Sequence, residues 1–130
     1  MHIQAFLSHF SQENSYTDTD IRAQDVEILV AHVLGENRSY LYTWPEHELD
    51  KVQLNRLNDL VSELKKGKPL AYVLGTQSFY GLEFLVNKNV LIPRSETELL
   101  VEKILDLGDS AEHLNILDLG TGSGAIALAL

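Results

Sequence analysis

The chain has 130 residues, 45% of them hydrophobic and 22% charged, which is the composition of a globular protein and excludes a fibre, a disordered tail and a membrane bundle. Ten Lys and Arg residues against 19 Asp and Glu residues give a net charge of −9, which disfavours direct binding to nucleic acid. There is no cysteine and the five histidines show no metal-binding spacing, so we expect no metal site. No apolar run reaches the roughly 20 residues of a membrane span and no basic export signal is present, so we expect a cytoplasmic protein without membrane contact.

The first seventy residues predict helices. Residues 3–10 carry apolar side chains at helical spacing, and a polar loop is expected over residues 11–19. A second helix is predicted from residue 23 to residue 34, with Asp20 as its N-terminal cap. Gly35 suits the left-handed conformation just after this helix.

Two further features complete the helical part. The aromatic segment 40–44 precedes Pro45, which disfavours helix at Trp44, and predicts a turn with buried rings. An exposed docking surface for a partner is the alternative for these rings. A third helix is predicted from about Glu48 to Lys66, ending at Gly67. The apolar stripe of this helix is expected to consist of Val52, Leu57, Leu60, Val61 and Leu64.

The hydrophobic period then changes to that of strands. The short runs 79–86 and 90–92 predict a small β-hairpin in which Gly81 makes a turn or a bulge. A further helix is predicted after it, because Ser95 and Glu98 have the spacing of a capping box ahead of an apolar run.

The last sixteen residues predict a strand, a glycine loop and a helix. Residues 115–119 form a short apolar strand, residues 120–124 read Gly-Thr-Gly-Ser-Gly, and an apolar helix follows. This order is the first half of a βαβ unit, which needs a parallel strand to return beside the first. We therefore expect the chain to be a piece of a longer protein. The alternative is a natural terminus packed on the helical domain.

The glycine loop predicts a cofactor site. Its three glycines let backbone amides approach a ligand, but their spacing also fits the form that binds dinucleotides. Asp118 lies two residues before the first glycine, where a carboxylate favours an ammonium group over a diphosphate. This favours S-adenosylmethionine over a nicotinamide cofactor. Two alternatives remain: a loop without a ligand, and an Asp118 that only caps the loop.

Two motifs carry a family resemblance. Residues 118–127, Asp-Leu-Gly-Thr-Gly-Ser-Gly-Ala-Ile-Ala, resemble the first motif of class I methyltransferases. Residues 91–98, Leu-Ile-Pro-Arg-Ser-Glu-Thr-Glu, resemble the signature of the HemK/PrmC family, which comprises the protein-(glutamine-N5) methyltransferases of peptide chain release factors. Residues 67–75 and 79–81 are similar to that family as well. Ser95 stands where the family usually has proline, and both residues start helices well.

The resemblance implies an α/β protein in three parts. An N-terminal all-α helical bundle that docks the substrate would span residues 1–75, and a β-hairpin linker would span residues 76–93. The start of a class I Rossmann-like methyltransferase domain, truncated here, would span residues 94–130. The implied activity is methyl transfer from S-adenosylmethionine to the glutamine of a Gly-Gly-Gln motif in release factors, by a monomeric enzyme.

The resemblance also implies roles for particular residues. The cofactor site would consist of Arg94, Thr97, Asp118, Gly120, Thr121, Gly122, Ser123 and Gly124. For Arg94 a surface ion pair with Glu96 or Glu98 is the alternative, and for Thr97 a plain position in the first turn of a helix. The family's catalytic Asn-Pro-Pro-Tyr motif would lie downstream, so we assign no catalytic residue here and expect this chain alone to be inactive. Rival functions are another amino-methyltransferase, a nicotinamide-dependent oxidoreductase and a helical interaction module.

Overall fold

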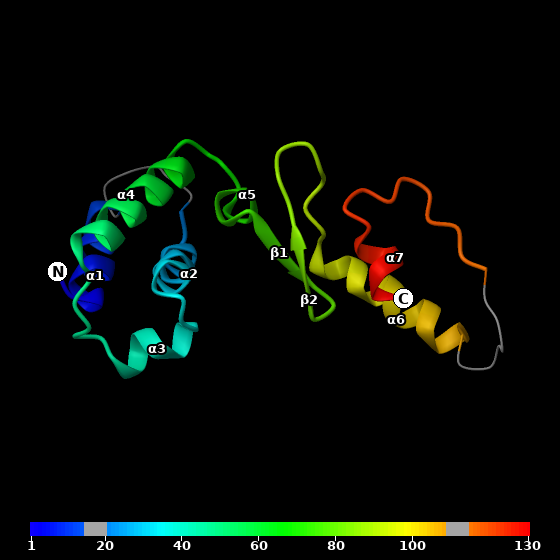
Figure 1. Cartoon of the computed structure of the whole chain (residues 1–130), viewed down its shortest axis with the longest axis horizontal. Helices are drawn as coiled ribbons and strands as arrows, with labels where there is room; N and C mark the ends of the chain where they lie inside the picture. Colours follow the sequence, from blue (N-terminus) through cyan, green and yellow to red (C-terminus); the bar gives the residue numbers. More distant parts are fainter. Residues whose placement is uncertain (15–20, 109–114) are drawn as a thin grey trace. The chain divides into compact units, whose positions relative to one another are not determined.

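A computed structural model of the chain describes residues 1–14, 21–108 and 115–130. Within them the chain forms two compact units, residues 1–74 and residues 75–130. The first unit is helical, and the second combines a two-stranded sheet with helices (Figure 1). The helical N-terminal part is therefore confirmed, while the Rossmann-like sheet stays a prediction.

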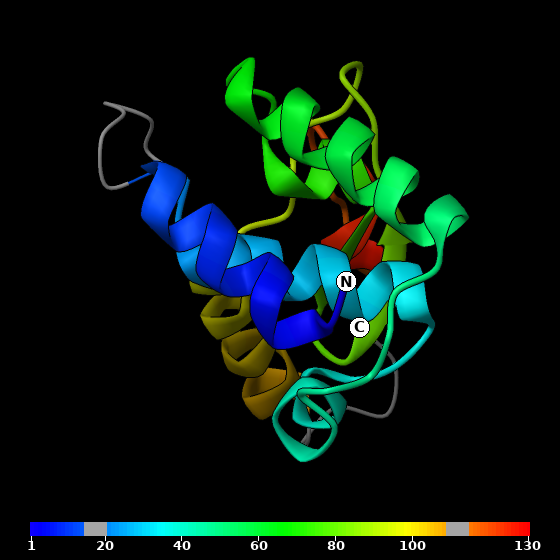
Figure 2. The same ribbon diagram turned by 90° about the vertical axis from the view of Figure 1, so that its left-hand side faces the viewer.

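The helical unit is built around α2. Figure 2 looks onto this unit, in which α1, α3, α4 and α5 each pack against α2 or against a helix that contacts it. The helices in the described residues of this unit are α1 (Ile3–Asn14), α2 (Ala23–Leu34), α3 (Arg38–Thr43), α4 (Lys51–Lys65) and α5 (Leu70–Leu74). The buried core contains Ile3, Phe6, Phe10, Val26, Leu29, Val30, Ala31, Leu41, Leu49, Leu57, Val61 and Leu64. Burial of such side chains, at about 25 cal/mol per Å² of apolar surface, is the main force that holds these short helices together.

The first two predicted helices are confirmed, with two corrections at their ends. Helix α1 continues to Asn14 instead of giving way to a loop at Ser11, because polar residues cost a helix less than about 0.7 kcal/mol each. The rest of the predicted loop, and Asp20, lie outside the described residues. The residue before α2 is Arg22, whose side chain makes no cap and instead donates to Asp25. Gly35 has φ of 70° and ends α2 in the left-handed conformation, as predicted.

The aromatic segment forms a helix, so the predicted turn is wrong, and the prediction of buried rings holds only for Tyr40, which is partly buried against the core. Helix α3 is capped by Asn37, whose side chain accepts a hydrogen bond from the Tyr40 amide, and it ends before Trp44. Tyr42 and Trp44 are 66% and 57% exposed. A six-residue helix buries only one side against its neighbours, and in α3 Leu41 takes that buried position.

Helix α4 is confirmed and begins with a capping box that the sequence reading missed. The Asp50 carboxylate accepts from the Gln53 amide at 2.8 Å, and the Gln53 side chain accepts from the Asp50 amide at 2.9 Å. Val52 was expected in the apolar stripe and is 76% exposed. It precedes Leu57 by five residues, so it does not share the face on which residues three or four apart line up.

The second unit begins with a hairpin. Strands β1 (Thr76–Phe79) and β2 (Leu82–Leu85) pair antiparallel, with Phe79 opposite Leu82. The turn residues Tyr80 and Gly81 have φ of 49° and 75°, so the turn predicted at Gly81 is confirmed. Residues 90–92 form no strand, contrary to prediction, and β2 takes β1 as its partner instead.

The helices of the second unit depart from the predicted pattern. The 3-10 turn η1 (Ser95–Thr97) leads into α6 (Glu98–Gly108), and no side-chain capping bond forms there, so the predicted capping box is wrong. Glu98 is bonded elsewhere, to the Tyr80 amide. The glycine loop is followed by the predicted helix, α7 (Ala125–Ala129).

The predicted strand at residues 115–119 is also wrong. Residues 115–118 have no regular secondary structure and Leu119 lies in a turn, and Leu117 and Leu119 are 80% and 83% exposed. A strand exists only by hydrogen bonding to a neighbour, and in the described residues no strand lies beside this segment. As for membranes, every helix in the described ranges is too short or too polar to cross a bilayer.

Candidate functional site

A hollow of about 190 Å³ in the second unit gathers three segments of the chain. The end of β1, the segment before α6, and the glycine loop with the start of α7 all contribute side chains or backbone. The residues that line it are Phe79, Leu91, Ile92, Pro93, Arg94, Thr97, Gly120, Thr121, Gly122, Ser123, Ala125 and Ile126. We call this hollow the glycine-loop pocket.

The glycines are required by the backbone conformation of the loop. Gly120, Gly122 and Gly124 have φ of 73°, 58° and 78°, a region that residues with a Cβ rarely adopt. A Cβ at Gly120 would meet no atom within 4 Å, so crowding does not explain the glycine there. The Gly124 amide donates to the Thr121 carbonyl at 2.9 Å and closes the loop before α7. Because α7 has only five residues and a weak dipole, the exposed backbone of the loop is a stronger candidate for contacting a ligand than the end of this helix.

Asp118 carries an unpaired carboxylate oxygen just ahead of this loop. Its Oδ2 atom is buried and has no hydrogen-bond partner among the described residues. A buried acceptor without a partner is costly, and in native proteins such an atom calls for an explanation. A donor from a ligand would satisfy it, and an ammonium group would do so with charge assistance. The Oδ2 atom accepts no hydrogen bond from the loop, so the alternative in which Asp118 caps the loop is not observed for this atom.

Six of the eight residues predicted from the sequence lie together in the pocket. They are Arg94, Thr97, Gly120, Thr121, Gly122 and Ser123. Gly124 precedes α7 as its N-terminal cap and does not line the pocket, and neither does Asp118. Arg94 makes no ion pair with Glu96 or Glu98 within the described part of the chain, and Glu98 accepts from the Tyr80 amide.

The structure adds an apolar wall that sequence reasoning did not assign. Phe79 is 1% exposed and packs edge to face on Phe84, with ring centroids 6.2 Å apart. Leu91, Ile92 and Pro93 form the rest of this wall. Residues 91–93 belong to the second motif that carries the resemblance and Phe79 to the similar segment 79–81, but these segments alone do not say which side chains face a cavity.

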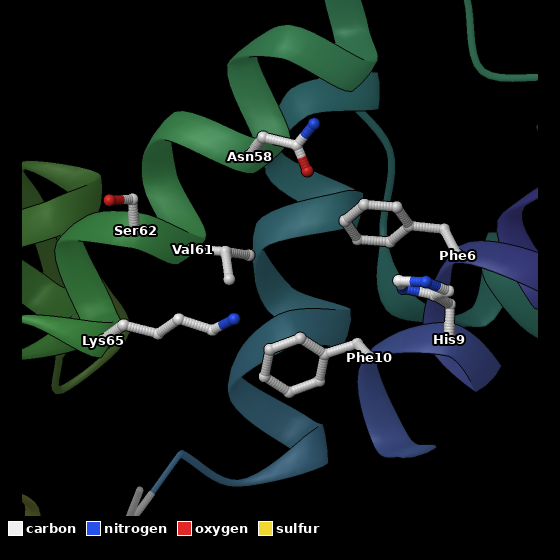
Figure 3. A pocket seen from close by; sticks show the side chains of 7 residues that line it. All are labelled: Phe6, His9, Phe10, Asn58, Val61, Ser62 and Lys65. Carbon is white, nitrogen blue, oxygen red and sulfur yellow. The ribbon is translucent and has the colours of Figure 1, made fainter. Parts of the chain in front are cut away.

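A second hollow, of about 340 Å³, lies in the helical unit between α1 and α4. Figure 3 shows Phe6, His9 and Phe10 from α1 facing Val61 and Lys65 from α4, with α2 behind them. The Lys65 ammonium lies 5.9 Å from the centre of the Phe10 ring. Although this hollow is larger, its lining residues include no glycine, so it lacks the exposed loop backbone of the glycine-loop pocket.

A metal centre is not found in the described ranges. No group of three His, Asp or Glu side chains within residues 1–14, 21–108 and 115–130 lies close enough to hold an ion.

Fold and pocket together define a chain with a helical domain followed by an α+β unit that presents a glycine loop. Comparison with known proteins identifies the family of the helical part. The profile of the PrmC N-terminal domain matches residues 6–75, which is more than half of the chain. The chain therefore belongs to the PrmC N-terminal domain family.

Similar proteins extend the comparison beyond this domain. The release factor glutamine methyltransferase of Shewanella oneidensis is 47% identical over 106 residues, which cover 82% of this chain and 37% of that protein. The proteins of the same name from Vibrio cholerae and Aliivibrio fischeri are each 43% identical, over 98% of this chain and 44% and 45% of their own lengths. The chain thus spans less than half the length of these relatives.

Proposed function

We propose that the complete protein transfers a methyl group from S-adenosylmethionine to the side-chain amide nitrogen of the glutamine in the Gly-Gly-Gln motif of a peptide chain release factor. The observation that carries this proposal is the glycine loop with the buried, unpaired Asp118 oxygen just before it. The names of the relatives that match nearly the whole chain support the same activity. A glycine loop alone would also fit a dinucleotide, but a carboxylate beside it, with one buried oxygen, disfavours two phosphates.

The proposed organisation follows the sequence motifs. Residues 1–75 would dock the substrate, residues 76–93 would link the two parts, and residues 94–130 would open a class I Rossmann-like domain. The edge of this domain that the described residues leave bare is apolar, because Leu117, Leu119 and Leu128 are each more than two-thirds exposed. Such side chains are those that the remaining strands and helices of a doubly wound fold would cover.

The residues present fit the methionine end of S-adenosylmethionine. Asp118 would accept hydrogen bonds from its ammonium group, which pairs the orphaned Oδ2 atom. The loop from Gly120 to Gly124 would surround the amino-acid part with backbone, and Arg94 and Thr97 would border the same pocket. When bound, S-adenosylmethionine supplies an electrophilic methyl group on a sulfonium.

The residues of the protein would act mainly by positioning the glutamine amide against the methyl donor. An amide nitrogen is a poor nucleophile because its lone pair is delocalised into the carbonyl, so the enzyme has to align it and accept hydrogen bonds from its NH₂ group. The apolar wall of Phe79 and Ile92 would exclude water from the pocket. The groups that accept from the amide belong to an Asn-Pro-Pro-Tyr motif absent from these 130 residues, so we propose that this chain alone is inactive. We further propose that the complete enzyme is monomeric and cytoplasmic.

Methyl transfer to a purified release factor tests the proposal. The complete protein is incubated with S-adenosylmethionine carrying a labelled methyl group, and the release-factor peptide that contains Gly-Gly-Gln is analysed by mass spectrometry. We expect one methyl group on the glutamine, and none on a matched release factor in which that glutamine is replaced by alanine. No label on the wild-type peptide, or tight binding of NADH in place of S-adenosylmethionine, would refute the proposed function.

A further inference from the structure

One hydrogen bond joins the hairpin to the start of α6. The Tyr80 amide donates to Oε1 of Glu98 at 2.8 Å, across 18 residues of sequence, in a partly buried position. Glu98 therefore does not serve the capping role that its spacing from Ser95 suggests.

The bonded amide lies at the most strained point of the hairpin. Tyr80 is the one non-glycine residue with positive φ in the described part of the chain, and Gly81 beside it also has positive φ. A two-residue turn with both φ values positive favours Asn, Asp or Gly, because a Cβ is unfavourable there. A tyrosine in this position needs compensation from its surroundings, and the Glu98 carboxylate accepts a hydrogen bond from its amide.

The same bond connects two walls of the glycine-loop pocket. Phe79 immediately precedes Tyr80, is 1% exposed and lines the pocket. Thr97 immediately precedes Glu98 and lines the pocket as well. Any release of the turn from Glu98 would therefore let Phe79 move relative to Thr97.

We propose that Glu98 is a positioning residue, whose carboxylate holds the Tyr80–Gly81 turn on α6 and thereby keeps Phe79 in the wall of the glycine-loop pocket. The inference rests on the proposed function in one respect, namely that this pocket receives S-adenosylmethionine. It assigns to Glu98 the role of a hydrogen-bond acceptor, and its negative charge is secondary. An uncharged acceptor of the same shape should therefore replace it.

The test compares E98A, E98Q and E96A in the complete protein. Glu96 is an exposed carboxylate two residues away without a bond to the hairpin, so E96A is the matched control for lost charge. We expect E98A to weaken S-adenosylmethionine binding in calorimetry by about tenfold and to speed hydrogen exchange at the Tyr80 amide by a similar factor. E98Q and E96A should stay within about twofold of the wild type in both measurements, because each keeps an acceptor at residue 98.

A rescue variant separates positioning from general damage. Glycine at residue 80 relieves the positive φ, so the turn should form without Glu98, and Y80G added to E98A should recover most of the lost affinity. The proposal is overturned if E98A behaves as the wild type, if E98Q is as impaired as E98A, or if Y80G rescues nothing. If the wild-type protein binds no S-adenosylmethionine, the proposed function fails, while exchange at the Tyr80 amide still decides whether Glu98 holds the turn.

Discussion

Replacing Asp118 by asparagine tests the electrostatic basis of the cofactor site. The change keeps the shape of the side chain and removes its negative charge. In the folded protein without ligand, Oδ2 of Asp118 is buried and unpaired, so its charge contributes nothing favourable there. We therefore expect D118N to leave the free energy of unfolding unchanged or slightly higher, while it weakens the binding of S-adenosylmethionine.

The expected loss of binding free energy in D118N follows from the kind of hydrogen bond that is removed. A hydrogen bond to a charged group contributes about 1.5–3 kcal/mol. The Asp118 residue as a whole is partly exposed, so we take the lower end of that range, about 1.5–2 kcal/mol. Since each 1.4 kcal/mol is a factor of ten, the dissociation constant should rise about 10–30-fold.

Calorimetry with two ligands on the complete protein measures this effect. S-adenosylmethionine carries the ammonium group, whereas methylthioadenosine has the same nucleoside without the amino-acid part, so only the first should lose affinity in D118N. Equal affinity of D118N and wild type for S-adenosylmethionine would refute the assignment of Asp118. An equal loss for both ligands would show that the change disturbs the pocket and does not remove an ammonium contact.

Three further predictions concern the helical unit. L57A, at a fully buried side chain, should lower the free energy of unfolding by about 2–5 kcal/mol in urea denaturation, whereas V52A at an exposed position should cost under about 0.5 kcal/mol. D50A should cost about 1 kcal/mol through loss of the capping box, and D50N should retain most of it; equal losses would contradict the cap. The hydrogen bond from Arg38 lowers the pKa of Glu27, so its stabilisation is present above the unfolded value of about 4.3 and is lost as pH falls through the folded pKa. E27Q should therefore be less stable than wild type at pH 7, with a difference that shrinks below about pH 4, and a constant difference would refute this account.

Local signals in the sequence predicted helices α1, α2 and α4 of the first unit but missed α3 and α5. Apolar spacing located α1, α2 and α4, and Gly35 and Gly67 marked two of their ends, because both features depend on residues three or four positions apart. The same kind of signal failed for Val52, whose apolar side chain suggested burial that helical geometry does not allow. The local sequence also did not reveal that Tyr42 and Trp44 would be exposed, since the exposure of these side chains depends on which side of the short helix α3 packs against α2.

The residues of the candidate site also fall into two groups, those that the sequence predicted and those that only the structure revealed. The glycines at 120, 122 and 124 and the carboxylate at 118 could be recognised from the sequence, because backbone freedom and charge are properties of single residues and short spacings. Only the tertiary structure placed Phe79 and residues 91–93 beside that loop. It also showed that Glu98 accepts a hydrogen bond from the Tyr80 amide and does not form a capping box with Ser95. Contacts between segments this far apart are decided by packing and by competition among hydrogen-bond partners, and neither is encoded in local spacing.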